Sequence, residues 1–470
     1  MFRGMSSGPS STAAPSSASS VQTAYVAFLA ATAALGGFLF GFDSAVINGA
    51  ISGLQHTYGS TSAGTGFAVA SILIGCAIGA LLAGRIADLH GRRIVMIVSA
   101  VIFALTAAGA GLASSTALFI LARFISGIGV GAASVVCPAY IAEISPPGIR
   151  GRLASLQQMG IVVGIFAALL SDALIAQAAG GVNADFHGEE AWRWMFIVEV
   201  APSILFGVAA LLIPESPRFL LAVRRKSAAL SVLQRIDPGT ADETLAEIEK
   251  TVHAERKPSL ADLRGPGGTV LAIVWIGVAL SALQQLVGIN SIFYYGALLW
   301  ESVGFTQADS LRINVLTSIV NIVSTFVAMA FVDKVGRRPL LLWGSVAMAV
   351  TLGVLVFTLR GGSGALSHNA GIVALLAANL YVFAFGVSWG PCVWILLGEM
   401  FPNSIRGSAM ALAVFAQWIA NWLITVSFPG IVSALGPSGA YAMYMFFAVL
   451  AFFFVQRFIR ETRGRALEEM

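Results

Sequence analysis

Long apolar stretches, separated by short polar breaks, run through almost all of this sequence of 470 residues. A transmembrane helix needs about 20 mostly apolar residues, and the chain can be divided into roughly twelve such stretches. Only 11% of the residues are charged, against about a quarter in soluble domains. We therefore predict an all-α membrane protein with twelve transmembrane helices. The expected spans are residues 23–46, 66–87, 93–113, 117–140, 152–177, 192–213, 268–293, 311–333, 338–358, 371–397, 407–430 and 440–459.

One long polar segment separates the first six stretches from the last six. Within it, residues 242–256 (DETLAEIEKTVHAER) place Leu245, Ile248 and Val252 at i, i+3 and i+7, which is the spacing of an amphipathic helix. We expect a short helical bundle on the membrane surface here, not a catalytic domain. The predicted parts are a disordered tail rich in Ser and Ala at 1–21, a six-helix half at 22–213, a linker at 214–267, a second six-helix half at 268–459 and a tail at 460–470.

The Lys and Arg residues fall almost entirely on one side of the predicted membrane. If the chain crosses the bilayer at each span, only Arg193, Arg312 and Arg360 lie in loops on the opposite side, and Arg123 lies within a span. The remaining bases share a side with both termini. Because Lys and Arg concentrate in cytoplasmic loops, we predict that both termini are cytoplasmic.

Three motifs of the first half recur in the second half. Residues 88–93 (DLHGRR) return at 333–338 (DKVGRR), and residues 143–151 (EISPPGIRG) return at 399–407 (EMFPNSIRG). A fainter echo links PESPRFLL at 214–221 with RETRGRAL at 460–467. All six copies lie on the predicted cytoplasmic side, so the halves are related by an axis along the membrane normal. Parallel six-helix repeats of this kind are typical of carriers that work by rocking, alternating access.

Acidic and Arg side chains of these motifs stand at the ends of neighbouring helices, where they can form bidentate pairs. We expect such pairs to lock the cytoplasmic faces together while the carrier is open outward. The alternative is that the Arg clusters only anchor loops to lipid headgroups. The candidate gate residues are Asp88, Arg92, Arg93, Glu143, Arg150 and Glu215 in the first half, and Asp333, Arg337, Arg338, Glu399, Arg406 and, as a weaker candidate, Glu461 in the second.

Three ionisable residues stand out inside predicted spans, where charge is costly and usually functional: Asp43, Arg123 and Glu199. A lone buried Arg needs a carboxylate partner, and Asp43 is the best candidate. Conformational opening could then switch Asp43 between proton-binding and proton-releasing states. The alternative is a permanent ion pair that only specifies helix packing.

Amide and aromatic side chains gather at other intramembrane positions. Amides offer both donors and acceptors to hydroxyl groups, and an indole face can cover the apolar side of a sugar ring. No cationic cluster lines the seventh span, which argues against a phosphate or carboxylate substrate. Each amide could instead be interhelical glue. The cluster comprises Gln158, Gln284, Gln285, Asn290, Tyr294, Asn321, Trp394, Gln417 and Trp418.

Several other functions are disfavoured. The cysteines Cys76, Cys137 and Cys392 sit in apolar runs without paired spacing, so neither a disulfide framework nor a metal site is expected. The five His residues fall in predicted loops or tail-like segments, and no nucleophile and base constellation or Walker motif is present. The net charge of +4 reports membrane orientation and does not indicate nucleic-acid binding. We therefore do not expect an enzyme.

Taken together, the motifs resemble the sugar porter family of the major facilitator superfamily over residues 24 to 467. The matching segments are GRIADLHGRR, PAYIAEISPPGIRGRLASLQQ, PESPRFL, QQLVGINSIFYY, VDKVGRRPL, SWGPCVWILLGEMFPNSIRG and QWIANW. The resemblance implies that the polar cluster above contacts a monosaccharide, together with Gly390, and that Phe40 lies near the site. It also implies that Asp43 and Arg123 form the proton-coupling pair of bacterial symporters. Arg460 stands where the family's last motif has Pro.

We therefore predict a monosaccharide:proton symporter of the plasma (inner) membrane, functional as a monomer in the lipid bilayer. The proton is the coupling ion, and no other cofactor is expected. The substrate is expected to be glucose or a related aldose. Ile165, one or two helical turns beyond Gln158, makes that part of the pocket less polar and favours a hexose. The alternatives are an uncoupled facilitative uniporter and, more remotely, a membrane sugar sensor that does not transport.

Overall fold

The computed structural model describes residues 22–146, 148–254, 263–264, 268–360, 366–402 and 405–462. The predicted tail at 1–21, part of the linker, and residues 463–470 lie outside this described part. So do the side chains of residues 251–254 and of Asp333.

In the residues that the structure describes, the first half contains eight helices that make six membrane crossings. A break at Val46 divides the first crossing into two helices, and a break at Val198 and Glu199 divides the sixth. Thr61 and Ser115 cap the helices that follow them by accepting hydrogen bonds from backbone N–H groups. The helices are α1 (Thr23–Ala45), α2 (Ile47–Tyr58), α3 (Ser62–His90), α4 (Arg92–Gly111), α5 (Thr116–Ile144), α6 (Arg150–Ala179), α7 (Ala191–Ile197) and α8 (Val200–Leu212), and a hairpin of β1 (Asp185–Phe186) and β2 (Glu189–Glu190) precedes α7.

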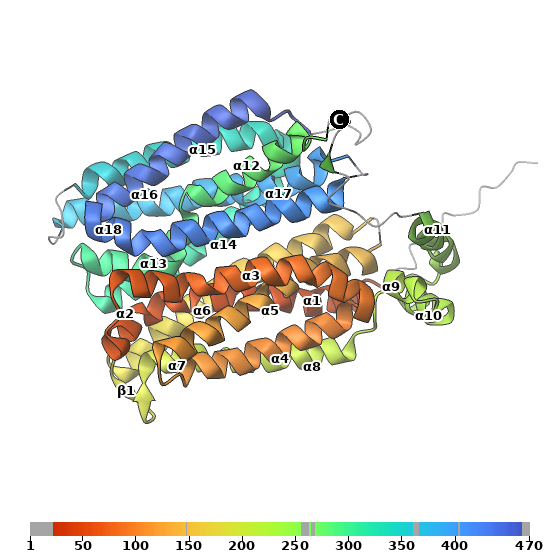
Figure 1. Cartoon of the computed structure of the whole chain (residues 1–470), viewed down its shortest axis with the longest axis horizontal. Coiled ribbons are helices and arrows are strands. Elements are labelled where there is room, and N and C mark those ends of the chain that lie inside the picture. Colours follow the sequence, from red (N-terminus) through yellow and green to blue (C-terminus); the bar gives the residue numbers. More distant parts are fainter. Residues whose placement is uncertain are drawn as a thin grey trace, which may run out of the picture.

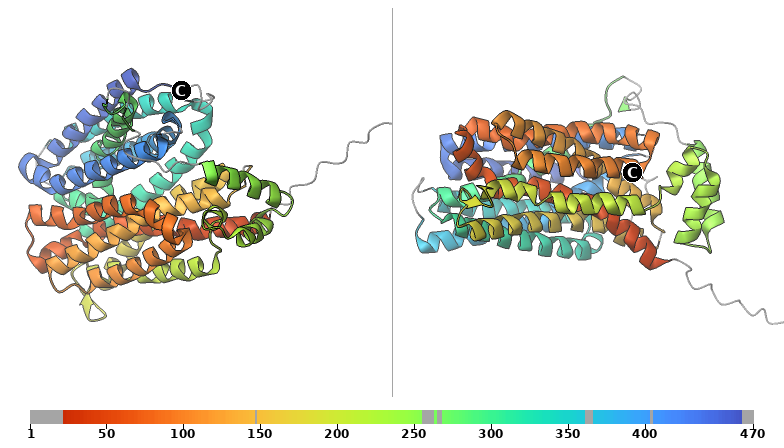
Figure 2. Two further views of the ribbon diagram at one scale, coloured as in Figure 1. Left: turned by 45° about the vertical axis from the view of Figure 1, so that its right-hand side comes forward. Right: turned by 90° about the horizontal axis from the view of Figure 1, so that it is seen from below.

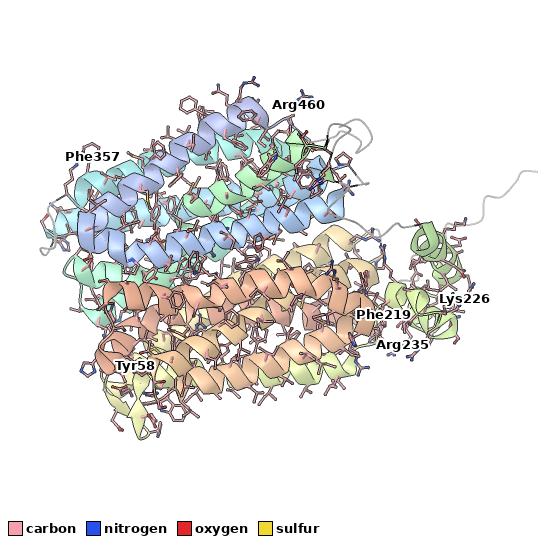
Figure 3. All side chains as sticks on the ribbon, viewed as in Figure 1. Tyr58, Phe219, Lys226, Arg235, Phe357 and Arg460 are labelled. Carbon is pink, nitrogen blue, oxygen red and sulfur yellow. The ribbon has the colours of Figure 1, made fainter. Side chains whose placement is uncertain are left out.

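The described part of the linker contains three short helices, α9 (Pro217–Ala222), α10 (Lys226–Ile236) and α11 (Ala241–Ala254). They lie beyond one end of the first half (Figure 1). The backbone N–H of Gln22 donates to the carbonyl of Ile236 at 2.9 Å, and the Arg235 guanidinium lies 4.6 Å from the centre of the Tyr25 ring. The linker is therefore attached to the start of α1. Figure 3 shows Lys226 and Arg235 on these helices and Tyr58 at the opposite end of the bundle.

The second half makes six further crossings within its described residues. Its last helix, α18, has 53 residues, which at 1.5 Å per residue gives about 80 Å, far more than one bilayer thickness. The backbone leaves helical geometry at Gly436, with φ at 71°, so α18 crosses twice. The helices are α12 (Ala272–Leu286), α13 (Ile289–Ser302), α14 (Gln307–Val335), α15 (Arg337–Thr358), α16 (His368–Val387), α17 (Trp389–Met400) and α18 (Arg406–Phe458).

The two halves stack side by side, with the first half in red to yellow and the second in green to blue (Figures 1 and 2). Glycines let the helices within a half touch closely. A Cβ atom at Gly127 would lie 2.0 Å from the carbonyl oxygen of Ile72, and one at Gly164 would lie 2.0 Å from that of Phe38. These contacts bring α5 against α3 and α6 against α1. The predicted all-α membrane fold with two six-helix halves is confirmed.

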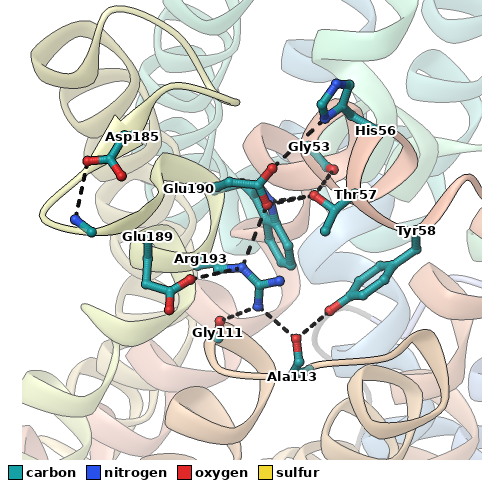
Figure 4. Close-up of polar contacts among 12 residues, drawn as sticks. Gly53, His56, Thr57, Tyr58, Gly111, Ala113, Asp185, Glu189, Glu190 and Arg193 are labelled. Carbon is teal, nitrogen blue, oxygen red and sulfur yellow. Dashed lines mark hydrogen bonds and ion pairs between the residues drawn. The ribbon is translucent and has the colours of Figure 1, made fainter.

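We call the end of the bundle beside α9–α11 the linker end and the other end the hairpin end. At the hairpin end Glu190 accepts hydrogen bonds from Thr57 and from the indole of Trp192. Arg193 lies beside Glu190 and also donates to the carbonyl of Ala113, as Figure 4 shows. This network fixes α2, the loop after α4 and α7 to one another.

Candidate functional site

A buried ion pair lies in the middle of the first half. Asp43 and Arg123 are 2% and 1% exposed, and Nη1 of Arg123 contacts Oδ1 of Asp43 directly. Nη2 of Arg123 also donates to the backbone carbonyl of Asp43 at 3.0 Å, and the Ser126 hydroxyl donates to Oδ2 of Asp43. The structure therefore brings the two residues together as the sequence led us to expect. Their role in proton coupling stays a prediction.

Glu199 stands beside this pair at the break between α7 and α8. Its side chain is buried and lies close enough to Asp43 and Arg123 to interact with both charges. Within the described part of the chain, Oε1 of Glu199 has no hydrogen-bond partner. The first half thus holds two acids and one base in one buried cluster.

The predicted amides of the second half meet where α12, α13 and α17 join. Nε2 of Gln284 donates to the carbonyls of Trp389 and Gly390 at 2.8 and 3.2 Å. Nε2 of Gln285 donates to Oε1 of Gln284 at 3.2 Å, and Nδ2 of Asn290 donates to Oε1 of Gln285 at 2.6 Å. The amides form one chain of hydrogen bonds.

Aromatic residues connect this amide chain to the first half. The rings of Phe40 on α1 and Trp418 on α18 lie 5.7 Å apart. The Tyr294 hydroxyl lies within interaction distance of the Asn421 side chain on α18. It also lies near the side chain of Ser44, the residue next to Asp43. The predicted proton and sugar sites are therefore neighbours.

The other predicted sugar contacts differ in exposure. Trp394 on α17 is 40% exposed, whereas Asn321 on α14 and Gln417 on α18 are buried. Gln158 on α6 is half-buried.

Several buried polar atoms have no hydrogen-bond partner among the described residues, and they include Oε1 of Gln157, Oε1 of Gln417 and Nε1 of Trp418. Such atoms are rare because leaving them unpaired is costly. Sequence reasoning missed Gln157, although it directly precedes Gln158 on the same helix. It also missed Asn421, which lies one turn beyond Gln417.

At the linker end, the first-half motifs form one polar cluster. Arg92 lies 3.1 Å from both Asp88 and Glu143. Glu215 accepts from the backbone N–H groups of Arg92 and Arg93 at 2.9 and 3.1 Å.

The second half repeats this cluster. Arg337 lies 2.9 Å from Glu399, and Glu461 accepts from the N–H groups of Arg337 and Arg338 at 3.1 and 3.0 Å. Glu461, the weaker candidate, is thus an equivalent of Glu215 despite the unusual Arg460 before it. Of the predicted gate residues, only the Asp333 side chain lies outside the described part.

The arginines Arg150 and Arg406 donate to nearby carbonyls, those of Ser145 and Phe401. All the gate contacts described here join elements of a single half. The expected locking of one half to the other therefore stays a prediction for a different conformation.

The halves are instead joined nearer the hairpin end. Nδ2 of Asn48 on α2 donates to the carbonyl of Phe293 at 2.8 Å, and Oδ1 of Asn48 accepts from the N–H of Ala297 and from Nδ2 of Asn314, both at 2.9 Å. Gln307 of the second half also donates to the Ser52 hydroxyl at 3.3 Å. Among the described residues, no group of His, Cys, Asp and Glu side chains could hold a metal ion.

A family model described as "Sugar (and other) transporter" matches residues 29–470, and the chain belongs to this family. It is therefore a membrane transporter and not an enzyme. The "Glucose transport protein" of Synechocystis sp. is 52% identical over 466 residues, which cover 97% of this chain and 100% of that protein. The "Glucose facilitated diffusion protein" of Zymomonas mobilis is 34% identical over 467 residues, covering 94% of this chain and 96% of that protein.

A solved structure confirms the major facilitator fold. It is that of the proton:xylose symporter XylE, a major facilitator superfamily protein, bound to 6-bromo-6-deoxy-D-glucose. It matches with a TM-score of 0.78 and 34% identity over 95% of this chain and 98% of that one.

Proposed function

We propose that this protein is a monosaccharide:proton symporter that works by alternating access, with glucose or a related aldose as its substrate. The observation that carries the proposal is the buried pair of Asp43 and Arg123 placed next to the amide and indole groups of the second half. A symporter needs a proton site and a sugar site that respond to each other.

The unpaired polar atoms support a sugar as substrate. A monosaccharide carries several hydroxyl groups, each able to donate and accept, and these would satisfy Gln157, Gln417 and Trp418. The Phe40 and Trp418 rings would cover the apolar face of the sugar ring. Glucose is favoured as the substrate because the relative named "Glucose transport protein" is 52% identical to this chain.

Proton coupling follows from the charge of Asp43. While it is ionised, it holds Arg123 through both its side chain and its backbone carbonyl. Protonation removes the charge attraction and releases Arg123 toward the neighbouring Glu199. Sugar binding then shifts the conformational equilibrium in proportion to its differential affinity for the two states.

We propose that the conformation described here is the one that is open toward the linker end. Support comes from Asn48, which ties the halves together nearer the hairpin end, while the gate charges pair within each half. The linker end is the cytoplasmic face, with both termini on that side of the plasma (inner) membrane, and the protein acts as a monomer. On opening outward, the gate charges would exchange partners between the halves.

The substitution Asp43→Asn tests proton coupling. In proteoliposomes with a proton gradient, we expect the variant to lose sugar accumulation at least tenfold but to keep sugar exchange. Asp309→Asn, a surface acid paired with Arg312 at the hairpin end, is the matched control and should accumulate sugar normally. Unchanged accumulation by Asp43→Asn would refute the proposed mechanism.

An uncoupled uniporter is the second candidate, and the facilitated-diffusion relative favours it. A uniporter would equilibrate sugar across the membrane without accumulation, and a proton uncoupler would leave its initial uptake rate unchanged. A non-transporting sugar sensor would bind glucose but fail to move it in the same proteoliposomes.

A further inference from the structure

A fourth buried ionisable residue in the first half has no place in the mechanism above. Asp172 lies on α6, inside the span Arg150–Ala179, and is 0% exposed. It stands seven residues before the end of the helix, about 10 Å from the hairpin end. Sequence reasoning did not single it out.

The Asp172 carboxyl packs directly against α2. Its Oδ2 accepts from the backbone N–H of Gly49 at 3.3 Å, and its Oδ1 has no hydrogen-bond partner among the described residues. A Cβ atom at position 49 would lie 2.6 Å from Cβ of Asp172, so only glycine permits this contact.

No described cation pairs with Asp172, because the charged groups on the helices around α6 have other partners. Arg123 of α5 is bound to Asp43 of α1, Arg193 of α7 lies beside Glu189 and Glu190, and Arg312 of α14 lies beside Asp309. An ionised carboxylate without a partner is very costly in such surroundings. The remaining charged groups on these helices are His56 near Glu190, Glu143 near Arg92, Lys334 beside Phe331, and Asp333, whose side chain is not described.

Asp172 also packs beside the break between α1 and α2. The break between α1 and α2 separates Asp43 from Asn48, the residue that ties the two halves together. On one side of the break, Arg123 binds the carbonyl of Asp43, and on the other side Asp172 binds the N–H of Gly49. A hydrogen-bond donor, Arg123, thus holds the backbone on one side of the break, and an acceptor, Asp172, holds it on the other side.

We propose that Asp172 is a protonated carboxylic acid that acts as a positioning residue for the start of α2. By holding Gly49, it keeps the adjacent Asn48 in place to close the hairpin end. The inference adds to the proposed function and depends only on the fold, and its tests measure neither sugar accumulation nor proton flux.

Infrared spectroscopy of the purified protein tests the protonation state. At neutral pH, the wild type minus Asp172→Asn difference spectrum should contain the carbonyl-stretch band of a protonated carboxylic acid. The corresponding Asp309→Asn difference spectrum should lack that band, because Asp309 is exposed and beside Arg312. A spectrum in which Asp172→Asn removes only carboxylate bands would overturn the proposal.

Accessibility at the hairpin end tests the positioning role. A cysteine introduced by Ser52→Cys can be labelled with a maleimide in detergent, where the three native cysteines are buried. In that background, Asp172→Asn should label within about twofold of the parent, because an amide oxygen still accepts from Gly49. Asp172→Leu leaves the N–H of Gly49 unpaired and should label at least about fivefold faster.

Two outcomes contradict this role. Equal labelling of the Leu variant and the parent would show that the hydrogen bond does not hold α2. Fast labelling of the Asn variant, while it remains monodisperse in size-exclusion chromatography, would show that a neutral group cannot replace Asp172.

Discussion

At the linker end, the two halves make the same set of contacts. Glu215 in the first half and Glu461 in the second each accept from the backbone N–H groups of two successive arginines. Ser216 donates to Glu143 just as Thr462 donates to Glu399. The two halves therefore repeat both the sequence motifs and the hydrogen bonds that these motifs make.

The membrane interiors of the halves differ. The first half buries the ion pair of Asp43 and Arg123 with Glu199 and Asp172, whereas the second half buries a chain of neutral amides around Gln284. In the proposed mechanism, the repeated clusters at the linker end act as the gate of both halves. In the proposed mechanism, the proton site lies in the first half and most of the sugar contacts lie in the second.

The largest expected effect is on the buried ion pair of Asp43 and Arg123, which has no counterpart in the membrane interior of the second half as far as it is described. Arg123→Ala leaves Asp43 as an uncompensated buried charge, which should cost about 3–5 kcal/mol of stability. Thermal unfolding followed by tryptophan fluorescence measures the loss. The double variant Asp43→Asn/Arg123→Ala should recover most of it, and a double variant as unstable as the two single losses combined would contradict the pairing.

The next effect concerns the amide chain of the second half. Gln284→Leu keeps the approximate shape but removes the donor to Trp389 and Gly390, so the affinity for glucose should fall about 10-fold to 100-fold. Isothermal titration calorimetry with glucose measures it. Gln55→Leu removes an amide that bonds Thr65 outside the site and should leave the affinity unchanged.

A smaller effect tests whether the two linker ends are equivalent. Glu215→Gln and Glu461→Gln should each cost about 1–2 kcal/mol, because a neutral amide accepts the two arginine N–H groups less strongly. The melting temperatures of the two variants should fall by similar amounts. A clearly smaller loss for Glu461→Gln would mean that Arg460 has weakened the second copy.

The smallest effect is expected at the hairpin end. The His56 side chain is 67% exposed and lies 3.9 Å from Glu190, so His56→Ala should change stability by only a few tenths of a kcal/mol. Glu190→Gln should cost more, because Glu190 also accepts from Thr57 and Trp192. Melting temperatures in the opposite order would show that the ion pair matters more than the buried hydrogen bonds.

The sequence was sufficient to predict the spans, the repeat and the pairing of Asp43 with Arg123. Apolar length and repeated spacing determine the first two, and a lone buried cation requires the third. The break at Val46 could not be predicted, because Arg123 and Asp172 hold it from other helices. The turn at Gly436 inside α18 was expected only as a gap between two spans.

Asp172 was missed for a related reason. It is a single acid in a strongly apolar span, and no nearby base in the sequence suggests a partner. Its meaning comes from Gly49, which lies far away in the chain. The unpaired atoms of Gln157, Gln417 and Trp418 likewise become visible only when their surroundings are known.

The contact of Gln22 with Ile236 bears on how the protein folds during its synthesis. It joins the first described residue to the linker, so all the groups that make this contact have been synthesised before the second half. Domains generally fold as units during synthesis, beginning at the N-terminus. We therefore expect the second half to insert beside a first half that is already folded, against which its own six helices can assemble.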